Sequence, residues 1–158
     1  MLDYFLGIIS SSIANPVIVS VILGILPVSE IRGAAIYSFS IGQPILILPA
    51  MVANIIVCPL ILLFWDVINI PKIASTILGG SLEKKLLKFG RNYEKQGLLA
   101  LILFIGIPLP LTGVYTGTLL AELLGIKRRN ILLASVIGVV LATVIMFFAL
   151  GGFSLLVH

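Results

Sequence analysis

Glu30 and Arg32 stand two residues apart inside an apolar stretch that runs from about Tyr4 to Trp65. Arg32 is the one basic residue of ten that falls outside two short clusters. A charge at bilayer depth costs about 3 kcal/mol on insertion scales, so it usually faces a protein interior or a wet cavity and has a partner. The pair therefore predicts a polar site inside a membrane protein.

The two side chains suit different chemical tasks. An arginine offers a planar fork of donors that matches a phosphate or a carboxylate, so Arg32 is the candidate anion binder. Glu30 is the candidate proton carrier, and we hypothesise that substrate binding at Arg32 breaks the Glu30–Arg32 pair and couples it to proton movement. The alternative is a structural ion pair that braces the fold, and the two roles can coexist.

A second segment, residues 108–117, is rich in proline, glycine and hydroxyl residues. Irregular backbone at membrane depth survives where protein or water satisfies its amides and carbonyls, so such segments line cavities. Helix N-termini following Pro27 and Pro110 would add partial positive charge. The candidate substrate and proton site comprises Ser29, Glu30, Arg32, Gly33, Pro108, Pro110, Thr112, Gly113, Tyr115 and Thr116.

The composition is that of an integral membrane protein. The 158 residues are 60% hydrophobic and 10% charged, with a mean hydropathy of +1.27, whereas soluble domains carry about 25% charged residues. Nine of the ten basic residues fall within residues 72–96 and 127–130, which predicts that these two loops are cytoplasmic. The positive charge is thereby explained without nucleic acid as a partner.

Residues needed for common catalytic sites are missing. The single histidine is His158, the single cysteine is Cys58, and no metalloprotease, hydrolase or ATP-binding signature occurs. We therefore expect no enzymatic activity, no metal and no cofactor, and any transport would be gradient-driven or facilitated. Cys58 lies in an apolar run, where we expect a small buried or lipid-facing residue.

The apolar segments predict how the chain crosses the bilayer. Residues 44–66 and 131–157 are each long enough to cross a hydrocarbon core of about 30 Å. Residues 72–96 alternate apolar and charged faces and predict an amphipathic helix on the membrane surface. Residues 97–126 lie between two cytoplasmic clusters and are broken by Pro108 and Pro110, so they must enter the membrane and return as a re-entrant hairpin.

The first half repeats this plan at an offset of 83 residues. Three pairs match, namely Pro27 with Pro110, Ser29 with Thr112 and Gly42 with Gly125. An odd number of crossings separates the halves, so the two hairpins would enter from opposite sides, as in secondary transporters with inverted repeats. The segment 4–26 is also long enough to span alone, and the sequence leaves that alternative open.

The predicted fold class is therefore an all-α integral membrane protein. It has two re-entrant helical hairpins of inverted topology, full transmembrane helices and one surface amphipathic helix, in a single membrane domain, 1–158. Repeat 1 covers 1–66 and repeat 2 covers 97–158. Because two spans offer little wall for a pathway, we also expect a homodimer.

Three further polar residues receive structural predictions. Glu122 lies about one turn before the basic corner, so we expect it to pair with Lys127 or Arg128 in preference to lining a path. Asn54 and Gln43 are expected to form interhelical hydrogen bonds.

The segments Glu30-Ile-Arg-Gly-Ala34 and Pro108-Leu-Pro-Leu-Thr-Gly-Val-Tyr-Thr-Gly117 carry a family resemblance. They resemble the small multidrug export protein family, a branch of the DedA-like (VTT or SNARE-associated) membrane proteins, whose patterns read Glu-Leu-Arg-Gly-Ala-Ile-Pro and Pro-x-Pro-Gly-Thr-Gly-Ala-Trp-Thr-Gly. This chain departs at Ile36, Leu111 and Tyr115, which stand where proline, glycine and tryptophan are expected.

The resemblance implies two facing re-entrant loops and a transport-like role in a prokaryotic cell membrane. DedA-like relatives are associated with proton-motive-force-dependent recycling of lipid carriers and with lipid scrambling. The leading prediction is a proton-coupled transporter or flippase for an amphipathic, anionic, lipid-like substrate, with membrane lipids as partners. The alternatives are a passive scramblase and a membrane-organising protein that transports nothing.

Overall fold

Helices form every element of the residues that the computed structural model describes, which are 15–68, 94–109 and 112–157. The chain divides into two units, one made of residues 1–54 with 143–158 and the other of residues 55–142. Each unit contains a pair of short helices joined by a turn. The predicted amphipathic helix lies outside the described residues as far as residue 93, and a single membrane domain stays a prediction.

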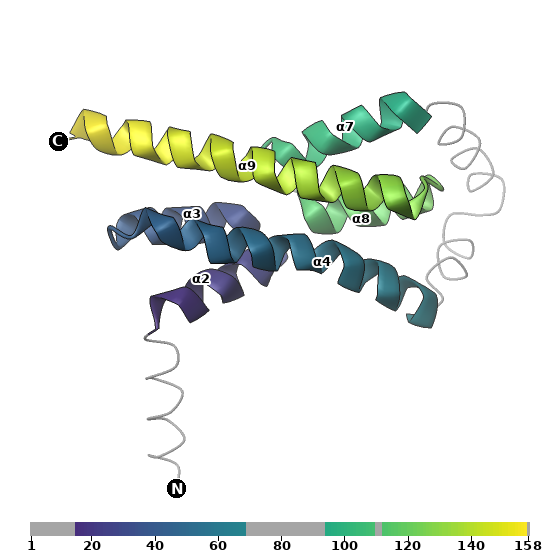
Figure 1. Ribbon diagram of the computed structural model, residues 1–158, viewed down its shortest axis with the longest axis horizontal. Coiled ribbons are helices and arrows are strands. Elements are labelled where there is room, and N and C mark those ends of the chain that lie inside the picture. The colour runs from purple at the N-terminus through teal and green to yellow at the C-terminus, as the bar shows by residue number, and fades with distance from the viewer. Residues whose placement is uncertain (1–14, 69–93, 110–111, 158) are drawn as a thin grey trace, which may run out of the picture. The chain divides into compact units, whose positions relative to one another are not determined.

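The first pair consists of α2 (Pro16–Ile25) and α3 (Glu30–Ser40), which pack against each other (Figure 1). Helix α2 begins sharply because the side chain of Asn15 accepts a hydrogen bond from the Val17 amide at 3.0 Å and proline occupies the first helical position. The helices have 10 and 11 residues, or about 15 and 17 Å at helical rise. Neither could cross a hydrocarbon core alone.

The carbonyl groups at the end of α2 find partners in side chains. The Ser29 hydroxyl donates to the Leu23 carbonyl at 2.9 Å, and the Asn54 amide donates to the Gly24 carbonyl at 2.7 Å. These groups lack intrahelical partners at any helix end, and leaving them unpaired in an apolar medium is costly. The break after α2 is thus compatible with an apolar environment, which is the condition for a helix that ends at membrane depth.

Helix α2 lies very close to the next long helix at one glycine. A Cβ built on Gly24 would lie 2.6 Å from the backbone oxygen of Ala50. Because a backbone atom cannot move aside as a flexible side chain can, the two helices would have to separate to admit a methyl group.

Replacing Gly24 with alanine is therefore expected to destabilise the protein by about 1–3 kcal/mol, the usual cost of overpacking. Thermal unfolding in detergent, followed by circular dichroism, measures the change. The matched control is Gly152→Ala, since nothing lies within 4 Å of a Cβ built there. An equal effect of the two substitutions would contradict the close approach.

Among the described residues, two helices are long and apolar enough to cross a membrane. One follows the short 3₁₀ helix η1 (Pro44–Leu46) and is α4 (Ile47–Ile68); the other is α9 (Arg128–Val157). They correspond to the spans predicted at 44–66 and 131–157. Helix α9 begins three residues earlier than predicted, because the Lys127 carbonyl accepts from the amides of Asn130 and Ile131 and draws the basic corner into the first turn.

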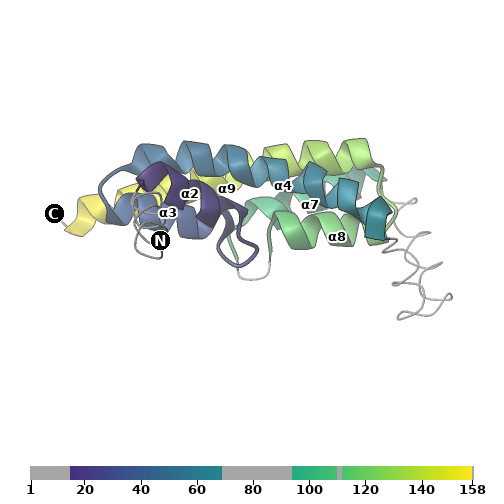
Figure 2. The ribbon, with the colours of Figure 1, turned by 90° about the horizontal axis from the view of Figure 1, so that it is seen from below.

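The second pair consists of α7 (Glu94–Gly106) and α8 (Val114–Leu123), which also pack against each other (Figure 2). Helix α7 ends two residues before Pro108, as expected from the missing amide donor and the restricted residue that precedes a proline. Ile105 fits against two glycines, since Cβ atoms built on Gly117 and Gly138 would each lie 2.7 Å from its side chain. Small residues at this contact allow α8 and α9 to approach α7 closely.

The two helical pairs end in the same local geometry. Helix α3 ends before Gly42 and α8 before Gly125, with φ angles of 69° and 67°. In both places the glycine amide donates to the carbonyl three residues back and the next amide to the carbonyl five residues back. This is the Schellman ending, which favours glycine at the left-handed position. The offset of 83 residues is thus supported by backbone hydrogen bonds, while inverted orientation of the two pairs stays a prediction.

Apolar side chains are exposed along the long helices, whereas small and polar ones are buried. Along α4, for instance, Val52, Ile56 and Leu60 are about half exposed, while Asn54 and Cys58 are almost fully buried. A soluble protein would place these classes the other way round. The pattern suits a helix whose outer face meets lipid and whose inner face meets other helices.

Candidate functional site

The predicted ion pair is present at the turn of the first helical pair. The Nη2 atom of Arg32 lies 3.4 Å from Oε2 of Glu30, with side chains 19% and 6% exposed. Glu30 is the first residue of α3, where the partial positive charge of the helix N-terminus also favours a carboxylate. The Glu30 carboxylate therefore lies between two sources of positive charge, the Arg32 guanidinium and the N-terminus of α3. The guanidinium is partly exposed.

The backbone of Glu30 is strained. Its φ is +48°, the one positive value among the non-glycine residues that the structure describes. The left-handed region costs an L-residue roughly 1–2 kcal/mol, and long side chains rarely occupy it. Residues held in this way collect at functional sites, where surrounding structure enforces the strain.

Ser29 and Gly33 shape the same turn. The Ser29 hydroxyl, which bonds to the end of α2, occupies the space in which a Cβ on Gly33 would stand. Any side chain at position 33 would displace this hydroxyl and free the Leu23 carbonyl. Gly33 thus acts as a positioning residue for the turn that carries Glu30.

The turn of the second helical pair is built around Thr112. Its hydroxyl lies 2.8 Å from the carbonyls of both Ile107 and Leu109 and 3.2 Å from the Leu109 amide. As Ser29 does in the first pair, Thr112 uses a hydroxyl to satisfy backbone groups at the end of the preceding helix. The next residue, Gly113, has φ 143° and ψ −170°, a conformation that is essentially restricted to glycine.

Glu30 and Gly113 are equivalent positions of the two pairs. They are 83 residues apart, the same offset as Ser29 and Thr112, and both have a positive φ. In the second pair the position holds the residue that adopts such a backbone without strain. In the first pair the position holds a glutamate, so glycine would fit the backbone conformation there better than the residue present.

The predicted site residues thus form two groups. One turn brings together Ser29, Glu30, Arg32 and Gly33. The other holds Pro108, Thr112 and Gly113, with Tyr115 half-buried and Thr116 exposed in the first turn of α8. Pro110 lies outside the described residues. Convergence of the two groups on one site stays a prediction.

Four other residues carry structural predictions, namely Glu122, Asn54, Gln43 and Cys58. Glu122 pairs with Arg128 as expected, with Nε 2.9 Å from Oε1. Asn54 forms the expected interhelical hydrogen bond through Gly24. Gln43 is exposed before η1, and no hydrogen bond from its side chain to another described helix accompanies this position, unlike its prediction. Cys58 is fully buried, in agreement with its prediction as a buried or lipid-facing residue.

One polar cluster was missed by sequence reasoning. The Cys58 side chain of α4 lies beside the side chains of Thr118 in α8 and Ser135 in α9. All three side chains are almost fully buried, and neither hydroxyl oxygen has a hydrogen-bond partner among the described residues. Small side chains of this kind allow neighbouring helices to approach closely. The residue types were visible in the sequence, but their meeting depends on the packing of three helices.

The described residues contain no group of three histidine, cysteine, aspartate or glutamate side chains placed to hold a metal ion. The first turn offers a carboxylate, a guanidinium and the hydroxyl of Ser29. This set can bind an anion and exchange a proton.

A comparison with protein families matches residues 30–145, about three quarters of the chain, to the family described as "Putative small multi-drug export protein". The matched region begins at Glu30, the first residue of α3, and includes the turn between α7 and α8. No curated protein and no solved structure matches the chain. The wider DedA-like relationship stays a prediction. Together with two helices long and apolar enough to cross a bilayer, the match shows that this is a helical membrane protein and that the chain belongs to the small multi-drug export protein family.

Proposed function

We propose that the protein is a small gradient-driven transporter or flippase for an amphipathic, anionic, lipid-like substrate, with proton coupling at Glu30. The observation that carries the proposal is the state of Glu30: it is 4% exposed, paired with Arg32, and held at a φ of +48°. A fold that only needed a turn there would gain stability from glycine or asparagine. The presence of a buried carboxylate on a strained backbone favours a chemical role.

The proposed coupling is an exchange of partners at Arg32. A phosphate or carboxylate of the substrate would take the place of the Glu30 carboxylate against the guanidinium, since both are planar or forked acceptors. Glu30, left without a counter-charge in a poorly hydrated place, would then take up a proton from the side to which the site is open. Departure of the substrate would restore the pair and release that proton.

The proposed pathway uses both short helical pairs as re-entrant hairpins of opposite orientation. The helices of the first pair have 10 and 11 residues, and the carbonyls at the end of α2 accept hydrogen bonds from Ser29 and Asn54. Such a helix is suited to ending inside a bilayer. The matching geometry at Gly42 and Gly125 favours an internal repeat, the usual architecture of secondary transporters. A homodimer would supply the wall that two spans lack.

Reconstitution into liposomes tests this function. The purified protein is incorporated with a fluorescent short-chain anionic phospholipid, and its movement between leaflets is followed with and without an imposed proton gradient. The proposal expects a gradient to accelerate movement in one direction and accumulate the lipid in one leaflet. Movement that is equal in both directions and indifferent to the gradient would overturn it.

That second outcome would identify a passive scramblase, which one observation favours. The short helices cover only about half of a hydrocarbon core, and such mismatch thins the bilayer locally. A thinned bilayer beside a polar groove lowers the barrier for headgroups without any energy source. The gradient experiment therefore separates the two functions.

A further inference from the structure

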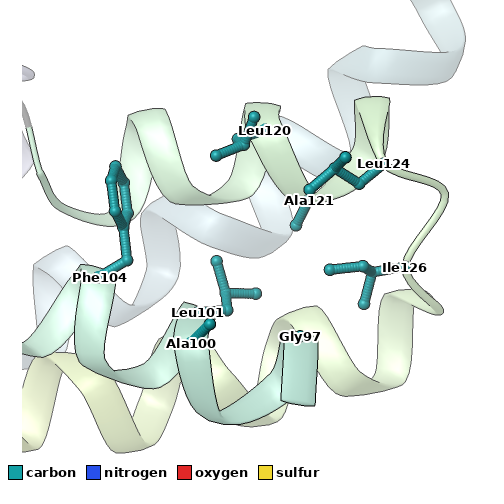
Figure 3. A pocket seen from close by; sticks show the side chains of 8 residues that line it. All are labelled: Gly97, Ala100, Leu101, Phe104, Leu120, Ala121, Leu124 and Ile126. Atoms are coloured by element: carbon teal, nitrogen blue, oxygen red, sulfur yellow. The ribbon is translucent and has the colours of Figure 1, made fainter. Parts of the chain in front are cut away.

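An apolar cleft of about 170 Å³ lies between α7 and α8, and none of the candidate site residues lines it. Figure 3 shows side chains of both helices directed into it. The lining is almost wholly apolar and includes Gly97, Leu101 and Phe104 of α7 with Leu120, Ala121 and Ile126. Seven residues separate Gly97 from Phe104, so the cleft follows the helix for about 10 Å.

One end of the cleft adjoins the basic corner. Gly97 and Ile126 line that end, and a Cβ on Gly97 would lie 3.6 Å from Cδ1 of Ile126. Ile126 is followed directly by three exposed cations, Lys127, Arg128 and Arg129. The apolar volume and the positive charge are therefore adjacent.

The local charge is positive even when both carboxylates of this end are counted. Glu94 begins α7 next to Lys95, and Glu122 precedes Lys127, Arg128 and Arg129. Glu122 bonds to Arg128 at 2.9 Å, so its charge is matched by one of the three cations. The N-terminus of the 30-residue helix α9 begins at Arg128 and adds partial positive charge. The segment from Glu122 to Arg129 thus presents a net positive charge at the Gly97–Ile126 end of the apolar cleft.

We propose that this cleft and the basic corner bind an anionic phospholipid of the surrounding bilayer, with one acyl chain between α7 and α8 and the phosphate against Lys127 and Arg129. Apolar lining alone would give no preference over other lipids, because hydrocarbon tails interact equally well with the bilayer itself. The cations provide the selection, since each basic residue near a membrane surface favours an anionic headgroup by about fivefold. The proposed site shares no residue with the Glu30–Arg32 pair, and it does not depend on the proposed function of that pair.

Quenching of a reporter tryptophan by brominated lipids tests the site in proteoliposomes. Phe104→Trp places the reporter in the cleft, and the signal of Trp65, the single native tryptophan, is subtracted with the wild-type protein. Leu99→Trp is the matched control, because Leu99 is 60% exposed on the same helix and does not line the cleft. The probes are acyl-brominated phosphatidylglycerol and phosphatidylcholine, each titrated over the same range of mole fractions.

We expect phosphatidylglycerol to quench position 104 at much lower mole fraction than phosphatidylcholine, and position 99 to respond equally to both. Adding Lys127→Gln and Arg129→Gln, both at exposed positions, should reduce the preference at position 104 by about 25-fold. Equal quenching by the two lipids at position 104, or an unchanged preference in the double glutamine variant, would overturn the proposal. So would weaker quenching at 104 than at 99 by both lipids, which would mean that protein covers the cleft.

Discussion

Glu30→Gln is expected to remove the acceleration of lipid movement by a proton gradient, so that the rate with a gradient falls to the rate without one. Glutamine has nearly the shape of glutamate and can still hydrogen-bond to Arg32, but it cannot take up a proton. A buried carboxylate that is paired at 3.4 Å is the group whose proton affinity would change when a substrate displaces it. The measurement is the fluorescent-lipid assay in liposomes with and without the gradient.

Glu122→Gln is the matched control, because it removes a carboxylate from the other arginine pair, at 2.9 Å from Arg128. This variant should keep its full response to the gradient. A Glu30→Gln protein that also keeps a full response would show that Glu30 carries no proton.

A second variant separates a chemical role from a bracing role. Removing one partner of a largely buried pair leaves an unmatched charge, whereas replacing both partners with apolar or neutral residues is often nearly neutral for stability. Glu30→Gln combined with Arg32→Met should therefore unfold near the wild-type temperature. If the pair only braces the fold, this double variant recovers transport together with stability; under the proposed function it remains inactive.

Gly113→Ala is expected to destabilise the protein by about 1–3 kcal/mol, because φ 143° with ψ −170° is a conformation that residues with a Cβ avoid. At about 2–4 °C of Tm per kcal/mol for a chain of this size, the loss is measurable by thermal unfolding in detergent. Gly152→Ala, in the interior of α9 with open space around its Cβ, serves as control and should be unchanged or slightly stabilised. Equal unfolding temperatures for the two variants would contradict the strain.

The equivalent position in the first pair gives the complementary test. Glu30→Gly and Glu30→Ala both remove the carboxylate, so their difference reports the backbone alone. In an ordinary helix alanine is better by about 1 kcal/mol. At a φ of +48° the order should reverse, with the glycine variant more stable by roughly 1–2 kcal/mol. A more stable alanine variant would contradict the strain assigned to the backbone at Glu30.

Much of the architecture follows from local properties of the chain. The two spans were predictable because partition into lipid depends on the length and composition of a segment, and both appear as α4 and α9. The break before Pro108 and the end of α2 before Pro27 follow from the backbone sterics of proline. The Glu30–Arg32 pair was predictable because the two charges are neighbours in an apolar stretch and have little else to pair with.

The sequence by itself therefore determined the class of protein, the spans, the breaks and the charged pair, because each depends on residues that are close along the chain. The tertiary structure decided how the broken ends are satisfied, as in the bond from Asn54 to Gly24 across 30 residues. It also decided the contact of Cys58 with Thr118 and Ser135 and the cleft that ends at Ile126. The backbone of Glu30 belongs to this second group, since a left-handed glutamate contradicts local preference and is held only where surrounding packing enforces it.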